Sequence, residues 1–127
     1  MIQAPDLPAL VLELGRVLVA LPRVEAGRRW RGPKPLLEKL RRRGRQAKRR
    51  GRAERARLRR AVGLIDRLMP GGPNCSRRAL LEIALDRGAA HEPFRMGFRV
   101  GPASISGHAW LGAEGGPSEG YQVQLEL

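Results

Sequence analysis

Apolar residues recur at helical spacing through most of the first seventy positions of the chain. A wide apolar stripe covers residues 7–21 and follows Asp6, which is a good helix N-cap. Because proline removes a backbone donor and clashes with the preceding turn, Pro22 is predicted to end this helix. Glycines and prolines punctuate residues 23–35, which are predicted to form a connector with Trp30 as an anchor.

Three further helices are predicted before the pattern changes. The first begins at residues 36–40 and continues into an arginine-rich segment. The second covers residues 53–69, where apolar residues keep a spacing of three and four until Pro70. The third covers residues 74–88, between a Pro-Gly-Gly-Pro turn and Gly88, which is a natural C-terminal stop.

After Gly88 the apolar positions alternate with polar ones, which is typical of β-strands. Strands are predicted over residues 94–100, 105–113 and 121–127, separated by loops rich in glycine and proline. Helices followed by an antiparallel meander indicate an α+β fold. In a meander the second and third strands pair, which would bring His108 opposite Gln122 and Gln124 and close to Glu119.

Charge is concentrated in one stretch. Residues 41–60 contain twelve Lys or Arg and one acid, which accounts for +11 of the formal net charge of +13. Gly44 and Gly51 weaken a helix there, so a frayed, solvated segment is predicted whose charges contribute little to stability. The segment has no aromatic side chain to stack on bases, which argues against nucleic acid as the partner.

The only cysteine, Cys75, falls in the first turn of the predicted helix 74–88. Unpaired N–H groups and the positive end of the helix dipole favour a thiolate there, so Cys75 is a candidate nucleophile. An equally weighted interpretation is that Cys75 is a small buried apolar residue. His108, on the second strand, is the candidate base, and His91 in the preceding connector is its rival.

A cysteine–histidine pair works best with a third polar group that orients the imidazole. The first choice for the group that orients the imidazole of His108 is Glu119, and the second is Gln122 or Gln124. The other candidates after His108 are Glu114 and Glu126. Glu114 lies six residues beyond His108, about 20 Å along an extended strand, and is the poorer choice.

Several classes of protein are disfavoured by the sequence. One cysteine and two histidines without ligand spacing argue against a metal site. The sequence contains no phosphate-binding loop motif, so ATP is not expected as a cofactor. The most apolar run, residues 7–21, is shorter than a membrane span and carries Glu13 and Arg16. Without disulfides or a signal peptide, a cytoplasmic protein is expected.

Five segments together resemble a known family. They are Arg60-Ala-Val-Gly-Leu-Ile-Asp-Arg-Leu-Met-Pro70, Asn74-Cys-Ser-Arg-Arg-Ala-Leu-Leu81, Asp86-Arg-Gly-Ala-Ala90, Phe98-Arg-Val-Gly101 and Gly107-His-Ala-Trp-Leu111. In order and spacing they are similar to the stand-alone leader peptidase of lasso-peptide biosynthesis, a transglutaminase-like cysteine protease. The resemblance covers about residues 55–127.

This resemblance implies a papain- or transglutaminase-like α+β core, which we assign to residues 53–127. The length of the chain predicts a single domain, in which the charge distribution indicates a helical N-terminal segment with a basic arm over residues 1–52. Cys75 and His108 fall on the family's catalytic positions. The family's acid after the His-Ala-Trp motif is most often Asp, but this chain has no Asp after Asp86, and Glu119 lies nearest the expected place.

The resemblance also implies a reaction and partners. The protein would cleave the leader from a precursor peptide, together with a separate leader-recognition protein and an ATP-dependent cyclase. Two alternatives remain. One is a small basic RNA-binding or assembly protein in which Cys75 is structural, and the other is a transglutaminase-type acyltransferase.

Overall fold

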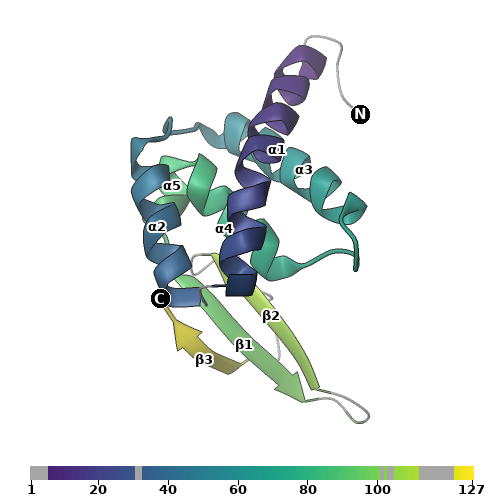
Figure 1. Cartoon of the computed structure of the whole chain (residues 1–127), viewed down its shortest axis with the longest axis vertical. Helices are drawn as coiled ribbons and strands as arrows, with labels where there is room; N and C mark the ends of the chain where they lie inside the picture. Colours follow the sequence, from purple (N-terminus) through teal and green to yellow (C-terminus); the bar gives the residue numbers. More distant parts are fainter. Residues whose placement is uncertain (1–5, 31–32, 101, 103–104, 112–121) are drawn as a thin grey trace.

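The structure is a computed structural model that describes residues 6–30, 33–100, 102, 105–111 and 122–127 (Figure 1). This part of the chain contains five helices followed by three strands. They are α1 (Asp6–Trp30), α2 (Pro33–Gln46), α3 (Arg52–Leu68), α4 (Cys75–Leu85), α5 (Arg87–Ala90), β1 (Phe94–Val100), β2 (Ile105–Leu111) and β3 (Gln122–Glu126). The predicted α+β class is confirmed.

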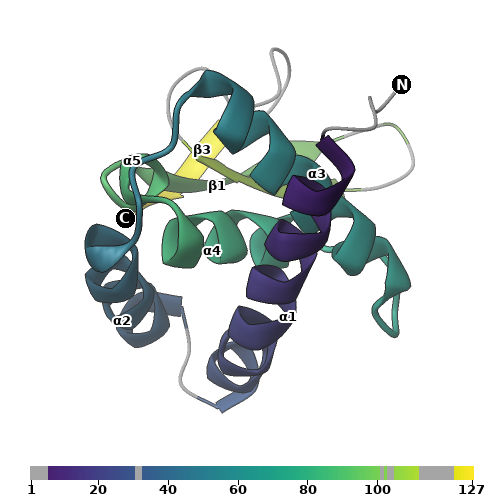
Figure 2. The ribbon, with the colours of Figure 1, turned by 90° about the horizontal axis from the view of Figure 1, so that it is seen from above.

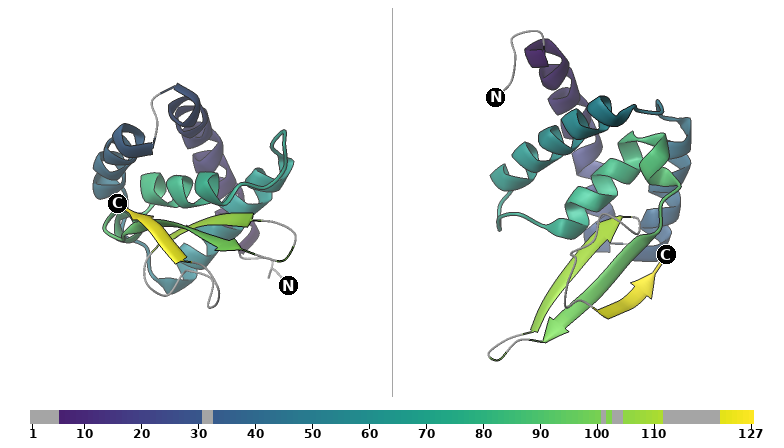
Figure 3. Two further views of the ribbon diagram at one scale, coloured as in Figure 1. Left: turned by 90° about the horizontal axis from the view of Figure 1, so that it is seen from below. Right: turned by 180° about the vertical axis from the view of Figure 1, so that it is seen from behind.

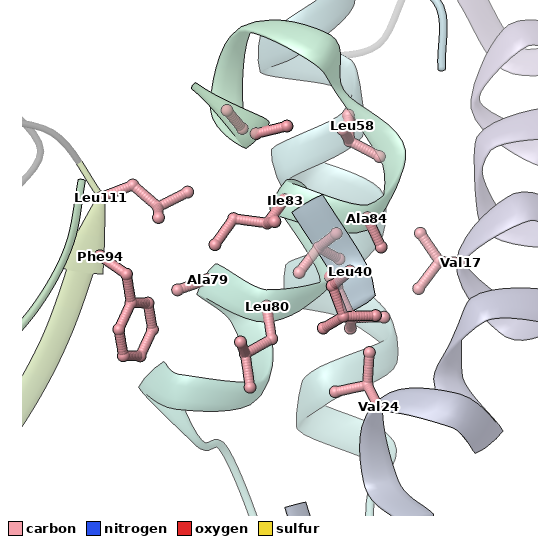
Figure 4. Close-up of a cluster of buried hydrophobic side chains, with 14 of the residues drawn as sticks. Val17, Val24, Leu40, Leu58, Ala79, Leu80, Ile83, Ala84, Phe94 and Leu111 are labelled. Carbon is pink, nitrogen blue, oxygen red and sulfur yellow. The ribbon is translucent and has the colours of Figure 1, made fainter. Parts of the chain in front are cut away.

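Helix α4 is the central element of the fold. It lies between the sheet on one side and α1 and α2 on the other, and it also contacts α3 and α5 (Figure 2, Figure 3). Its apolar side chains face both ways: Figure 4 shows Ala79, Leu80 and Ile83 between the strand residues Phe94 and Leu111 and the α1 residues Val17 and Val24. One continuous core therefore joins the sheet to the N-terminal helices.

The three strands form an antiparallel sheet in the order β2-β1-β3, so β1 is central and β2 lies at one edge of the described sheet. Gly97 of β1 is opposite His108 on one side and Val123 on the other. The predicted meander is therefore wrong, because β3 pairs with β1 and not with β2. Consequently His108 does not lie opposite Gln122 or Gln124; a whole strand separates them.

Helix α1 is longer than predicted. It continues through Pro22 to Trp30, so the predicted stop at Pro22 and the connector over residues 23–35 are wrong. Pro22 has no backbone N–H, so the carbonyl of Leu18, four residues earlier, lacks its helical hydrogen bond. Both residues lie on the exposed side of α1, where water can satisfy that carbonyl. Val24, beyond the proline, is fully buried and ties the second part of α1 to the core.

The arginine-rich segment is mostly helical, so the predicted fraying is wrong, whereas most of its basic side chains are exposed to solvent as predicted. Residues 41–46 belong to α2 and residues 52–60 to α3. Gly44 allows α2 to pass close to α4, because a Cβ atom there would lie 1.9 Å from the carbonyl oxygen of Ile83. The charged side chains also pack: the Arg50 guanidinium lies 2.5 Å from Glu13 Oε1 and donates to the Leu85 carbonyl at 3.1 Å.

Helix α4 ends before Gly88, which was predicted to be its stop. Asp86 is both the C-cap of α4 and the N-cap of α5, and its carboxylate accepts from the backbone N–H groups of Gly88 and Ala89. The capping preference of aspartate, rather than the freedom of glycine, sets this boundary. The predicted helix over residues 53–69 and the strand over residues 94–100 are confirmed as α3 and β1.

Candidate functional site

The loop before α4 is built to start a helix sharply. Gly71 and Gly72 both have positive φ, at 87° and 83°, which a residue with a side chain rarely adopts. Asn74 then caps the helix, its side-chain oxygen accepting from the backbone N–H of Arg77 at 3.0 Å. Cys75 is therefore the first residue of α4, as the sequence predicted.

A buried cluster of charges fixes this helix start against α1 and α3. Asp66 of α3 is 1% exposed and accepts hydrogen bonds from the backbone N–H of Asn74, at 3.0 and 3.1 Å. Arg77 of α4 donates to Asp66 at 2.7 Å and to Glu25 of α1 at 2.5 Å. Burial raises the pKa of Glu25, but hydrogen bonds from Arg77 and Arg28 outweigh it and leave that pKa below its ordinary value.

Sequence reasoning missed this cluster, although the pattern contained a signal. Asp66 follows Val62 by four residues, and Arg77 precedes Leu80 and Leu81 by three and four, so both charges lie on apolar stripes. A charged residue on the buried face of an amphipathic helix needs a partner of opposite charge. Reading the stripes for charged interruptions would have predicted the pair.

Cys75 is partly buried and lies beside the edge strand β2. Its Sγ atom accepts a hydrogen bond from the backbone N–H of Ala109 at 3.3 Å. Ala109 directly follows His108 in the chain. The start of α4 is thus joined to β2 at the residue next to the predicted base.

Cys75 and His108 line the same cavity, which has a volume of about 650 Å³ and is formed by α3, α4 and β2. His91 lies in the turn after α5, is exposed and does not line it. Of the two histidines, His108 is therefore the one that the fold brings to the cysteine's cavity.

The imidazole of His108 stacks on Trp110, with ring centroids 5.8 Å apart and an interplanar angle of 17°. Burial, and then the positive charge of Arg78, hold the pKa of His108 below its ordinary value. The neutral imidazole is the form that can accept a proton from a thiol.

The predicted third residue, Glu119, and the weaker choice Glu114 lie outside the described residues. Gln122 and Gln124 belong to β3, on the far side of β1 from His108. Glu126 is at the exposed end of β3, where its carboxylate pairs with Arg95 at 3.1 Å. Of the predicted site residues, the structure thus brings Cys75 and His108 together in one cavity.

The described residues contain neither a metal site nor a membrane-spanning helix. No group of three or more His, Cys, Asp or Glu side chains there could hold a metal ion. No helix in those ranges combines the length and apolar character that crossing a lipid bilayer requires.

Comparison with known families gives one match. The model of the transglutaminase-like superfamily matches residues 17–126, which include α4, β2 and most of α1. Comparison with curated proteins and with solved structures gave no significant match. A transglutaminase-like domain fits a cysteine peptidase or an acyltransferase. Since the match covers most of the sequence, the chain belongs to the transglutaminase-like superfamily.

Proposed function

We propose that this protein is a cysteine peptidase that removes the leader from a ribosomally synthesised precursor peptide during lasso-peptide maturation. The observation that carries the proposal is that Cys75, at the start of α4, and His108 of β2 line one cavity in a transglutaminase-like chain. The lasso-peptide context is supported by the resemblance of the five sequence segments around these residues.

The proposed mechanism is acyl-enzyme chemistry. His108 takes the proton of the Cys75 thiol, and the sulfur attacks the scissile carbonyl. The backbone N–H of Cys75 is in the first turn of α4, where an N–H group has no partner within the helix, so it would stabilise the oxyanion. His108 then protonates the leaving amine, and water releases the acyl group from sulfur.

Glu119 is our proposal for the group that orients His108, and it rests on the family resemblance alone. Glu119→Gln is expected to slow cleavage, whereas Glu114→Gln is expected to change it little. If Gln124→Ala abolishes cleavage and Glu119→Gln does not, the carboxylate assignment fails.

A partner surface is offered by the outer face of α1. Leu7, Val11, Leu12, Leu18 and Val19 are exposed there, and Leu12 and Val19 also line an apolar groove between α1 and α2 of about 630 Å³. Contiguous exposed apolar side chains mark interaction sites. We propose that the leader-recognition protein docks on this face, and that Leu12→Lys with Val19→Lys weakens its binding.

The central experiment uses the precursor peptide, the recognition protein and this chain, with products followed by mass spectrometry. Cys75→Ala should abolish leader release and His108→Gln should reduce it by at least about 100-fold. His91→Gln is the matched control and should cleave normally. Leader release that survives Cys75→Ala would contradict the proposal.

The same family match also fits acyl transfer to an amine. The two reactions share the acyl-enzyme and differ in what attacks it. Adding a primary amine to the cleavage reaction distinguishes them: a peptidase gives the free acid, whereas a transferase gives the amide of the added amine.

A further inference from the structure

The cavity that holds Cys75 and His108 is strongly positive. Among the described residues that line it are four arginines, Arg59, Arg60, Arg67 and Arg78, and one carboxylate, Glu82. These described lining side chains therefore carry an excess of three formal positive charges. Concave, low-dielectric walls focus such a field and concentrate ligands of opposite charge.

The nearby carboxylates Glu82 and Asp66 do not neutralise this excess of positive charge. Glu82 is already engaged by Arg59, whose Nε lies 2.8 Å from its Oε1. Arg78 lies 3.4 Å from Asp66, but Asp66 also pairs with Arg77 at 2.7 Å and accepts from the Asn74 backbone. One buried carboxylate thus faces two guanidinium groups.

Arg60 and Arg67 carry the excess most directly. Both are exposed on the cavity side of α3, and neither forms an ion pair with any carboxylate in the described part of the chain. Since the two residues are seven apart, they lie on the same face of α3, two turns from each other. A ligand carboxylate between them would meet two guanidinium groups.

The positive field also reaches the proposed base. Burial is the larger cause of the lowered pKa of His108, and the positive charge of Arg78 lowers that pKa further, so the field of this one arginine extends to the reacting end of the cavity.

From this charge distribution we infer that the cavity selects acidic peptide segments, with Arg60 and Arg67 binding Asp or Glu side chains beside the scissile bond. The peptide nature of the ligand rests on the proposed function, whereas the preference for carboxylates rests on the cavity alone. Nucleic acid is the less suitable anion. Among the described residues that line the cavity, Trp110 is the only aromatic one apart from His108, and it is itself stacked on that histidine.

The chain offers a direct probe of this preference, because it contains one cysteine and that cysteine lines the cavity. Iodoacetate and iodoacetamide react with a thiolate in the same way: a sulfur–carbon bond forms and iodide leaves. They differ in charge. The ratio of their rates, relative to the same ratio for glutathione, therefore reports how the cavity treats a carboxylate.

We expect this relative ratio to be at least about tenfold in favour of iodoacetate at about 20 mM salt and to fall at about 500 mM salt. Arg60→Gln combined with Arg67→Gln should lower it several-fold. Arg42→Gln, which removes an exposed arginine of α2 away from the cavity, is the matched control and should leave it unchanged. Circular dichroism should show that all these variants are folded.

A ratio equal to that of glutathione would overturn the inference, and so would a raised ratio that the Arg60 and Arg67 substitutions do not change. Protection of Cys75 from alkylation by tetraglutamate, but not by tetralysine, would support an acidic peptide as the ligand. Stronger protection by polyuridylate would overturn an acidic peptide as the ligand class.

Failure of the proposed function gives a different result: the ratio of alkylation rates is raised, but the precursor is not cleaved. Cleavage with an unraised ratio would remove this inference and leave the peptidase.

Discussion

Asp66 and Arg77 illustrate how single residues position the candidate nucleophile without taking part in its chemistry. They join α3 to α4 immediately before and after Cys75, and Glu25 extends the cluster to α1. Because both side chains are almost completely buried, their charges are tolerated only because they pair with each other, with further support from Glu25 for Arg77 and from Arg78 for Asp66. They are positioning residues for the start of α4.

Asp66→Asn is therefore expected to destabilise the fold. It removes the negative charge that faces Arg77 in a buried setting, and breaking such a pair costs about 3 kcal/mol or more of unfolding free energy. Urea denaturation measures the loss. Glu126→Gln, which breaks the exposed pair with Arg95, is the control and should change the unfolding free energy by less than about 0.5 kcal/mol. Equal effects of the two substitutions would contradict the role assigned to Asp66.

The protonation of His108 gives a second prediction at this scale. Burial and Arg78 lower its pKa, so its NMR titration midpoint should fall below about 6.5. Removing the positive charge with Arg78→Gln should raise the midpoint. The sign follows because a nearby cation disfavours the protonated imidazole. A His91→Gln background leaves one histidine to follow, and a midpoint that does not move in the Arg78 variant would exclude this arginine as a cause.

The candidate nucleophile Cys75 and the candidate base His108 could be chosen from the sequence. The third residue, which would orient His108, could not be placed from the sequence. Cys75 was predicted because its position depends on a local signal, a Pro-Gly-Gly-Pro turn followed by a helical pattern. His108 was preferred to His91 because the alternating pattern places it on a strand, and the family resemblance points to the same residue. The third residue depended on a strand pairing, and the pairing that was predicted is wrong.

At the scale of elements, helices whose boundaries are set locally were predicted well and those set by packing were not. Helix α3 has a regular apolar stripe and ends beside Pro70. Helix α1, by contrast, passes through Pro22 because Val24 is held in the core beyond it. The sheet order β2-β1-β3 was equally inaccessible, since the alternation that identifies a strand does not identify its neighbours.

Arg50 and Arg49 form a matched pair for testing the arginine-rich segment. The Arg50 side chain is 4% exposed and links Glu13 of α1 to the end of α4, whereas Arg49 is exposed. Arg50→Gln removes the buried partner of Glu13 and leaves only its ion pair with the half-exposed Arg16, so we expect a loss of about 1.5–3 kcal/mol in unfolding free energy. Arg49→Gln should change it by less than about 0.5 kcal/mol. Thermal melts with the same small shift in both variants would restore the view that the whole segment is solvated.

For the molecule as a whole, α1 combines two roles. One face buries Leu10, Val17 and Val24 in the core, and the opposite face exposes apolar side chains between Leu7 and Val19. Exposed apolar side chains that gather on one face of a helix mark an interaction site. The inner face is covered by this chain itself, and the outer face is the one we assign to the partner.

Because one face of α1 belongs to the core, deletion of residues 1–22 is expected to unfold the chain. The deletion removes Leu10 and Val17 from the core and Glu13 from Arg50, so α2, α3 and α4 lose their common support. Truncating even one buried leucine costs about 2–5 kcal/mol, and a small domain has only about 5–15 kcal/mol in total. We expect the truncated chain to lose its cooperative thermal transition by circular dichroism, whereas deletion of residues 1–5 should preserve it. Leu12→Lys with Val19→Lys should also preserve it, because those side chains lie on the outer face. A truncated chain that still melted cooperatively would show that α1 is an appendage to the core and that its apolar residues serve the partner alone.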